Sequence, residues 1–68
     1  MIEDVLNNSV RKFLKTVGVS SQREIEKAVR QAIADGRLKG RETLPAKMVL
    51  TLGEVNLNFE VEGSIELE

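Results

Sequence analysis

A chain of 68 residues without cysteine or histidine must be held in its fold mainly by the burial of apolar side chains. No disulfide can form, and the usual ligands of structural zinc are missing. A chain of this size buries only about 60% of the surface that it exposes when unfolded, so it usually needs a disulfide, a metal ion or a second chain. Association with another polypeptide is therefore the expected source of additional stability.

The first part of the chain has the apolar spacing of an amphipathic helix. Five apolar residues recur three or four positions apart, which predicts a helix over residues 4–17: Leu6, Val10, Phe13, Leu14 and Val17. Asp4 is expected near the positive N-terminal end of this helix. Gly18 follows the last apolar position, where a left-handed residue often ends a helix.

A second helix is predicted over residues 21–35. Ser21-Gln22-Arg23-Glu24 has the spacing of a capping box, in which the serine and the glutamate each bind the other's backbone amide. An apolar stripe follows, made of Ile25, Ala28, Val29, Ala32 and Ile33. Gly36 is expected to end the helix.

The chain then changes from helical to strand periodicity. Residues 36–45, which hold two glycines and Pro45, are predicted to form a connector. Apolar and polar residues alternate over 46–52 and 57–67, which predicts an antiparallel hairpin with one solvated face. Gly63 marks either a bulge or a turn into a short third strand, and both interpretations remain open.

The sequence therefore predicts an α+β fold of order ααββ, with two amphipathic helices packed on a hairpin. The expected core is made of apolar residues from all four elements: Leu6, Val10, Phe13, Leu14, Val17, Ile25, Val29, Ile33, Met48, Leu50, Leu52, Leu57, Phe59 and Val61.

Self-association is the favoured function. A hairpin of two strands is marginal in water, and an open strand edge can pair with another chain. The residues expected on the self-associating strand are Leu57, Phe59, Val61, Ile65 and Leu67. We expect a homodimer with joined sheets or exchanged strands. A monomer with its hairpin shielded by its helices, and an adaptor that accepts a strand from another protein, are the alternatives.

Charge is divided unevenly along the chain. Residues 11–47 hold all ten lysines and arginines with four acidic residues, whereas residues 48–68 hold five acidic residues and no base. These two parts are expected to attract each other, within one chain or between two.

Nucleic-acid binding is the alternative function. Arg23, Lys27 and Arg30 project together from the second predicted helix. Arg37, Lys39 and Arg41 extend this basic surface into the connector, and together they could follow a phosphate backbone. The two predicted helices also resemble a helix-turn-helix superficially. The acidic hairpin and the lack of aromatic residues for base stacking count against this function.

No residue pattern indicates catalysis, so the chain is not expected to be an enzyme. The serines have no histidine base, and the lysines fall at solvated positions. Glu60, Glu62 and Glu66 share one strand face, which is more typical of a solvated sheet surface than of acid–base chemistry. No glycine-rich phosphate loop occurs. We predict no catalytic, cofactor-binding or metal-binding residue and no cofactor.

No apolar run is long enough for a membrane span, and the acidic N-terminal residues do not resemble a signal peptide. A cytoplasmic location is therefore expected.

Several segments resemble a family of short bacterial proteins, a domain of unknown function found mainly in proteobacteria. The similar segments are Arg11–Lys15, Gly18-Val19, Ser21–Val29, Lys39-Gly40 and Glu42–Pro45. The resemblance extends over nearly the whole chain. It implies a bacterial cytoplasmic protein but no activity, ligand or catalytic residue.

Overall fold

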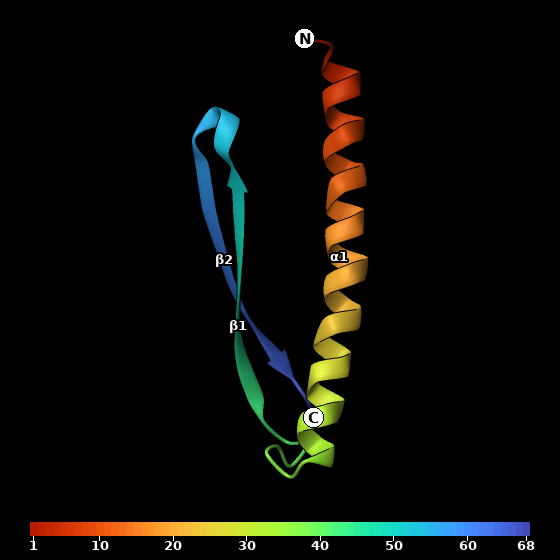
Figure 1. Ribbon diagram of the computed structural model, residues 1–68, viewed down its shortest axis with the longest axis vertical. Helices are drawn as coiled ribbons and strands as arrows, with labels where there is room; N and C mark the ends of the chain where they lie inside the picture. Colours follow the sequence, from red (N-terminus) through yellow and green to blue (C-terminus); the bar gives the residue numbers. More distant parts are fainter. The chain divides into compact units, whose positions relative to one another are not determined.

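The computed structural model describes all 68 residues as one long helix followed by a two-stranded hairpin (Figure 1). Helix α1 spans Glu3–Ala34, and strands β1 and β2 span Thr43–Leu52 and Leu57–Glu66. The chain divides into two units, one of residues 1–37 with α1 and one of residues 38–68 with the hairpin. The predicted α+β class is confirmed.

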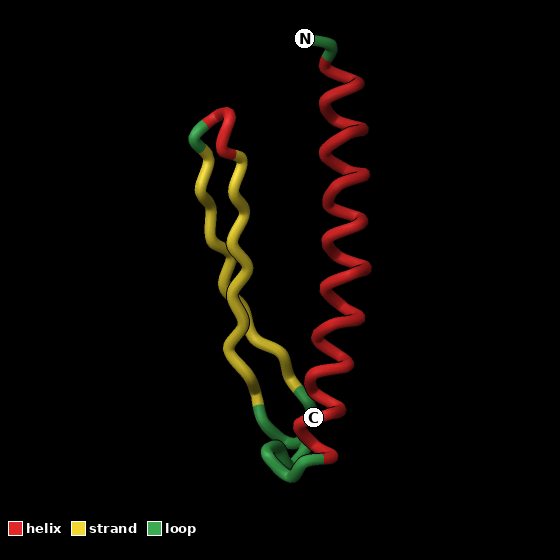
Figure 2. Tube along the Cα trace, in the orientation of Figure 1, coloured by secondary structure: helices red, strands yellow, loops and turns green.

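The prediction of two helices is wrong, because α1 is continuous through residues 18–21 (Figure 2). Gly18 does not adopt a positive φ, so it does not form a left-handed helix end. One glycine inside a helix costs only about 1 kcal/mol relative to alanine, and no proline follows it to stop the helix. Ser21 consequently lies in the helix interior rather than at an N-cap. The actual N-cap is Ile2, which makes no side-chain capping bond.

Specific residues explain where α1 begins and where it ends. Glu3 and Asp4 lie in the first turn, where their charges favour the positive end of the helix dipole, as predicted for Asp4. Gly36 has a φ of 80°, and its N–H donates to the Ile33 carbonyl at 3.1 Å. The N–H of Arg37 donates to the Ala32 carbonyl at 2.9 Å. This pair of bonds is a Schellman motif, which confirms Gly36 as the helix end.

The hairpin begins earlier than predicted and has an uninterrupted register. Strand β1 starts at Thr43 instead of residue 46, so the connector covers residues 35–42 and Pro45 lies within the strand, paired with Ser64. Strand β2 ends at Glu66 instead of residue 67. Ala46 pairs with Gly63 in the same register as all the other pairs. Gly63 therefore marks neither a bulge nor a turn into a third strand.

The turn between the strands is short. Gly53–Val55 form one turn of 3-10 helix, and Asn56 follows with a φ of 55°. The N–H of Asn56 donates to the Gly53 carbonyl at 3.1 Å. Asparagine tolerates the left-handed region better than most residues, which explains why the chain reverses here.

The predicted core is made of residues that lie at the surface of their own units. None of its residues is buried; Val17, Val29 and Leu50 are half-buried and the others are exposed. Ala32 is the one buried residue of the chain. The reason is geometric: a single helix and a single hairpin each have an apolar face, but neither unit contains a second layer to cover that face.

A glycine-to-alanine comparison tests the continuous helix. Gly18→Ala is expected to stabilise α1 by about 1 kcal/mol, because alanine favours helical geometry and an added Cβ would meet no atom within 4 Å. Gly36→Ala should destabilise the helix end by about 1 kcal/mol, because Gly36 has a positive φ. Thermal unfolding followed by far-UV circular dichroism measures both effects. A lower melting temperature for both variants would contradict the continuous helix.

Candidate functional site

One face of the hairpin is entirely apolar. Five cross-strand pairs make up this face: Leu44–Ile65, Ala46–Gly63, Met48–Val61, Leu50–Phe59 and Leu52–Leu57. The period of two in both strands puts these residues on the same side. We call this set the hairpin apolar face. Phe59 and Val61 are 54% and 52% exposed, so it is an open apolar surface.

The opposite face of the hairpin is polar and acidic. Its pairs are Thr43–Glu66, Pro45–Ser64, Lys47–Glu62, Val49–Glu60 and Thr51–Asn58. The Lys47 ammonium lies 3.8 Å from the Glu60 carboxylate. No group of acidic residues in the chain converges on a point where it could hold a metal ion. The three glutamates of β2 lie in a row along the strand instead.

Helix α1 has an apolar line along most of its length. Eight positions define this line, which we call the α1 stripe: Leu6, Val10, Leu14, Val17, Ser21, Ile25, Ala28 and Ala32. Their separations repeat as four, four and three, which is an 11-residue period. Such a period averages about 3.67 residues per turn and favours a right-handed supercoil between helices. The two stripes predicted for separate helices are therefore one line, interrupted only by Ser21.

The six basic residues predicted to contact nucleic acid lie in both units. Arg23, Lys27 and Arg30 are four and three positions apart on α1, which puts them on one helix face. At 100° per residue this face lies opposite the α1 stripe. Arg37 belongs to the helix unit, whereas Lys39 and Arg41 belong to the hairpin unit. The helix-turn-helix interpretation is wrong, because residues 18–21 are helical.

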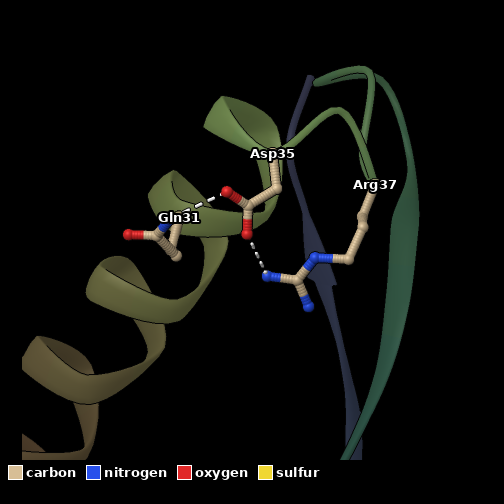
Figure 3. A network of polar contacts seen from close by, with 3 residues as sticks. All are labelled: Gln31, Asp35 and Arg37. Carbon is tan, nitrogen blue, oxygen red and sulfur yellow. Dashed lines mark hydrogen bonds and ion pairs between the residues drawn. The ribbon is translucent and has the colours of Figure 1, made fainter.

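Two of these six cations have acidic partners. The guanidinium of Arg30 lies 3.8 Å from the Glu26 carboxylate, one helical turn away. The guanidinium of Arg37 lies 3.0 Å from the Asp35 carboxylate. The Gln31 side-chain amide donates to the other oxygen of Asp35 at 2.9 Å (Figure 3). This network offsets the unfavourable position of an acidic residue at the negative end of α1.

Glu42 organises the connector, a role that the sequence analysis missed. Its carboxylate accepts backbone hydrogen bonds from Lys39 at 2.9 Å, Gly40 at 2.9 Å and Arg41 at 3.1 Å. Gly40 has a φ of 97°, a conformation that favours glycine. The Glu42 carbonyl also accepts from the N–H of Leu67 at 3.0 Å, just beyond the strand pairs. In the sequence, Gly40 is the residue that could have indicated this turn.

These amides alter the acidity of Glu42. The N–H of Lys39 contributes most to lowering the pKa of the Glu42 carboxyl below its usual range, and the amides of Gly40 and Arg41 act in the same direction. Hydrogen bonds to the charged form favour that form. Glu42 is therefore a structural acceptor, with its lone pairs used by the connector.

No helix in the structure combines the length and the hydropathy needed to cross a membrane.

The acidity of Glu42 gives a pH-dependent test of the connector. Because its pKa is lowered by folding, the stabilisation is present above the ordinary glutamate pKa of about 4.3 and is lost as the pH falls through the lowered value. We expect the amide NMR signals of Lys39, Gly40 and Arg41 to shift together in that acidic range. Glu42→Gln should abolish this common titration. Titration of these amides at an ordinary glutamate pKa, or its persistence in the Gln variant, would contradict the assignment.

Comparison with known proteins identifies a family but no activity. No curated protein and no solved structure matches the sequence. A family of unknown function, DUF6494, matches residues 1–68, which confirms the resemblance seen in the sequence. A bacterial source and a cytoplasmic location stay predictions. Since the match covers the whole chain, the protein belongs to the DUF6494 family of unknown function.

Proposed function

We propose that the protein is a small, non-enzymatic interaction module that forms a homodimer through the α1 stripe. The observation that carries this proposal is an apolar line that runs for most of a 32-residue helix and has no covering layer in its own unit. Leu14, in the N-terminal half of α1, is 52% exposed. Helices of this kind obtain most of their stability from packing of the apolar face.

The spacing of the stripe is symmetric about Ser21. Towards the C-terminus the stripe continues after four, three and four residues, at Ile25, Ala28 and Ala32. Towards the N-terminus it continues after the same steps, at Val17, Leu14 and Val10. A second copy that runs in the opposite direction with Ser21 at the two-fold axis therefore presents the same spacing. Two-fold dimers require this kind of self-complementary surface.

Side-chain size supports the antiparallel orientation. With Ser21 on the axis, Val10 faces Ala32 and Leu14 faces Ala28 of the second copy. These two outer contacts each join a larger and a smaller residue, and nearer the axis Val17 faces Ile25. A parallel pair would put leucine against leucine at one end and alanine against alanine at the other. Uneven packing of that kind leaves voids, which are costly in a protein interior.

The charges on α1 are compatible with this arrangement. Arg23, Lys27 and Arg30 lie on the helix face opposite the stripe and stay in solvent when two helices pair. Antiparallel packing also brings opposite ends of the two helix dipoles together. The dimer therefore requires no burial of a lysine or arginine.

Cysteine cross-linking tests both the dimer and its direction, because the chain has no cysteine of its own. Ser21→Cys is expected to form an intermolecular disulfide on mild oxidation, since the two copies meet at this residue. Val10→Cys should not, because the two Val10 positions are about 33 Å apart in the antiparallel pair. Cross-linking of both variants would indicate a parallel pair. A monomer mass by sedimentation equilibrium together with no cross-link at Ser21→Cys would overturn the dimer.

A substitution in the stripe gives an independent test. Leu14→Glu should weaken the dimer by about 2 kcal/mol or more, or roughly 30-fold, because it removes a buried leucine and introduces a charge. Thr16→Glu is the matched control, since Thr16 lies away from the stripe on the same helix. Sedimentation at several concentrations measures both dissociation constants. Equal weakening by the two variants would assign the effect to charge and not to the interface.

Nucleic-acid binding is the second candidate, supported by the common face of Arg23, Lys27 and Arg30 on α1. Binding through these residues depends on phosphate neutralisation, so affinity for a labelled DNA or RNA duplex should fall steeply between about 50 and 200 mM salt. Lys27→Gln should reduce the slope of log affinity against log salt concentration by about 1. Fluorescence anisotropy measures the slope. Absence of binding at low salt would remove this candidate.

A further inference from the structure

The two edges of the hairpin are not equivalent. In an antiparallel ladder, hydrogen-bonded pairs alternate with non-hydrogen-bonded pairs. The bond from the Leu67 N–H to the Glu42 carbonyl shows that residues 42 and 67 form a hydrogen-bonded pair, which identifies the type of every other pair. It follows that the pair of Pro45 and Ser64 does not exchange hydrogen bonds, and that the backbone groups of both residues point outward. Pro45 has no N–H, so the outer edge of β1 has a missing donor. Proline at an edge is a known protection against pairing with another strand.

The outer edge of β2 has no such interruption. The same alternation directs the N–H and C=O groups of five of its residues away from β1: Asn58, Glu60, Glu62, Ser64 and Glu66. The sheet has only two strands, and the register of β2 contains no bulge. An extended chain segment can therefore pair with β2 over most of its length, as in recognition by strand addition.

The side chains of these five residues define the charge of a suitable partner. They lie on the polar face of the hairpin and include three glutamates, of which only Glu60 has a cation within 4 Å, the Lys47 ammonium at 3.8 Å. Residues directly opposite across a strand pair are about 5 Å apart, so opposite charges attract and like charges repel there. A segment with lysine or arginine at alternate positions complements this row.

A second copy of β2 cannot place lysine or arginine opposite these glutamates, because β2 contains neither residue. The outward backbone groups permit only antiparallel registers that pair even-numbered residues with even-numbered residues. In each such register that covers more than half of β2, at least one glutamate lies opposite a glutamate of the other copy. A parallel pair through this edge would put the polar face of one copy beside the apolar face of the other. The glutamate row thus disfavours sheet joining through β2 itself.

We infer that the outer edge of β2 is a docking site for an extended segment of another protein in which lysine or arginine alternates with apolar residues. The basic residues lie opposite Glu60, Glu62 and Glu66 on the polar face. The apolar residues lie beside Phe59 and Val61 and widen the hairpin apolar face by one strand. This inference does not depend on the helix-mediated dimer, because it uses only the hairpin unit.

A synthetic peptide tests the edge directly. The probe is an eight-residue peptide that alternates lysine and valine, added to the full-length protein, with two controls: a peptide of the same composition with the lysines grouped at one end, and one with glutamate in place of lysine. Hydrogen exchange followed by NMR should show at least tenfold slower exchange for the outward amides of β2, those of Glu60, Glu62 and Ser64 among them. The outward amides of Lys47 and Val49 in β1 should be unchanged. Slower exchange on β1 instead of β2 would overturn the inference.

Two further comparisons separate strand pairing from simple charge attraction. N-methylation of every second peptide amide, on the side that faces β2, should weaken binding at least tenfold without any change in the protein. Glu62→Lys should weaken binding of the unmodified peptide about fivefold. Equal binding of the grouped-lysine peptide, or of the methylated peptide, would show non-specific attraction and overturn the inference. Cross-linking of the Ser21→Cys variant is unaffected by either result, so failure here is distinguishable from failure of the dimer.

Discussion

The structure depends on one constraint: each of its two units has a single apolar face and no second layer to cover it. Helix α1 has its stripe from Leu6 to Ala32, and the hairpin has five apolar cross-strand pairs. No disulfide can compensate for this, because the chain has no cysteine. The apolar surfaces are therefore the main features through which the protein can gain stability, and contact with another chain is the route that we propose.

Charge and backbone geometry distinguish the surfaces from one another. The α1 stripe is uncharged and nearly symmetric about Ser21, which suits a second copy of the same helix. The outer edge of β2 is acidic and repels its own equivalent, which suits a partner of opposite charge. Pro45 protects the edge of β1. On these features rests our proposal that different parts of this short chain contact different partners, as in an interaction module.

The sequence predicted some elements better than others, for identifiable reasons. The hairpin was predictable because alternation with a period of two specifies both the strands and the face that each residue occupies. The end of α1 at Gly36 was predictable from its glycine. The predicted break at Gly18 is wrong, because one glycine and a capping-box pattern do not end a helix whose four-residue steps continue from Val17 to Ser21 and on to Ile25. Glu42 was missed, because bonds from a carboxylate to nearby amides leave little trace in residue type alone.

The sequence by itself determined the α+β class, the hairpin and its acidic face, the end of the helix at Gly36 and the absence of thiol or imidazole chemistry, because these follow from residue type and local periodicity. Only the tertiary structure decided that the helix is single, that Pro45 and Gly63 lie inside a regular ladder, and that Glu42 holds the connector. These features depend on competition between weak local preferences of about 1 kcal/mol, and the backbone hydrogen bonds of the complete helix and sheet decide that competition.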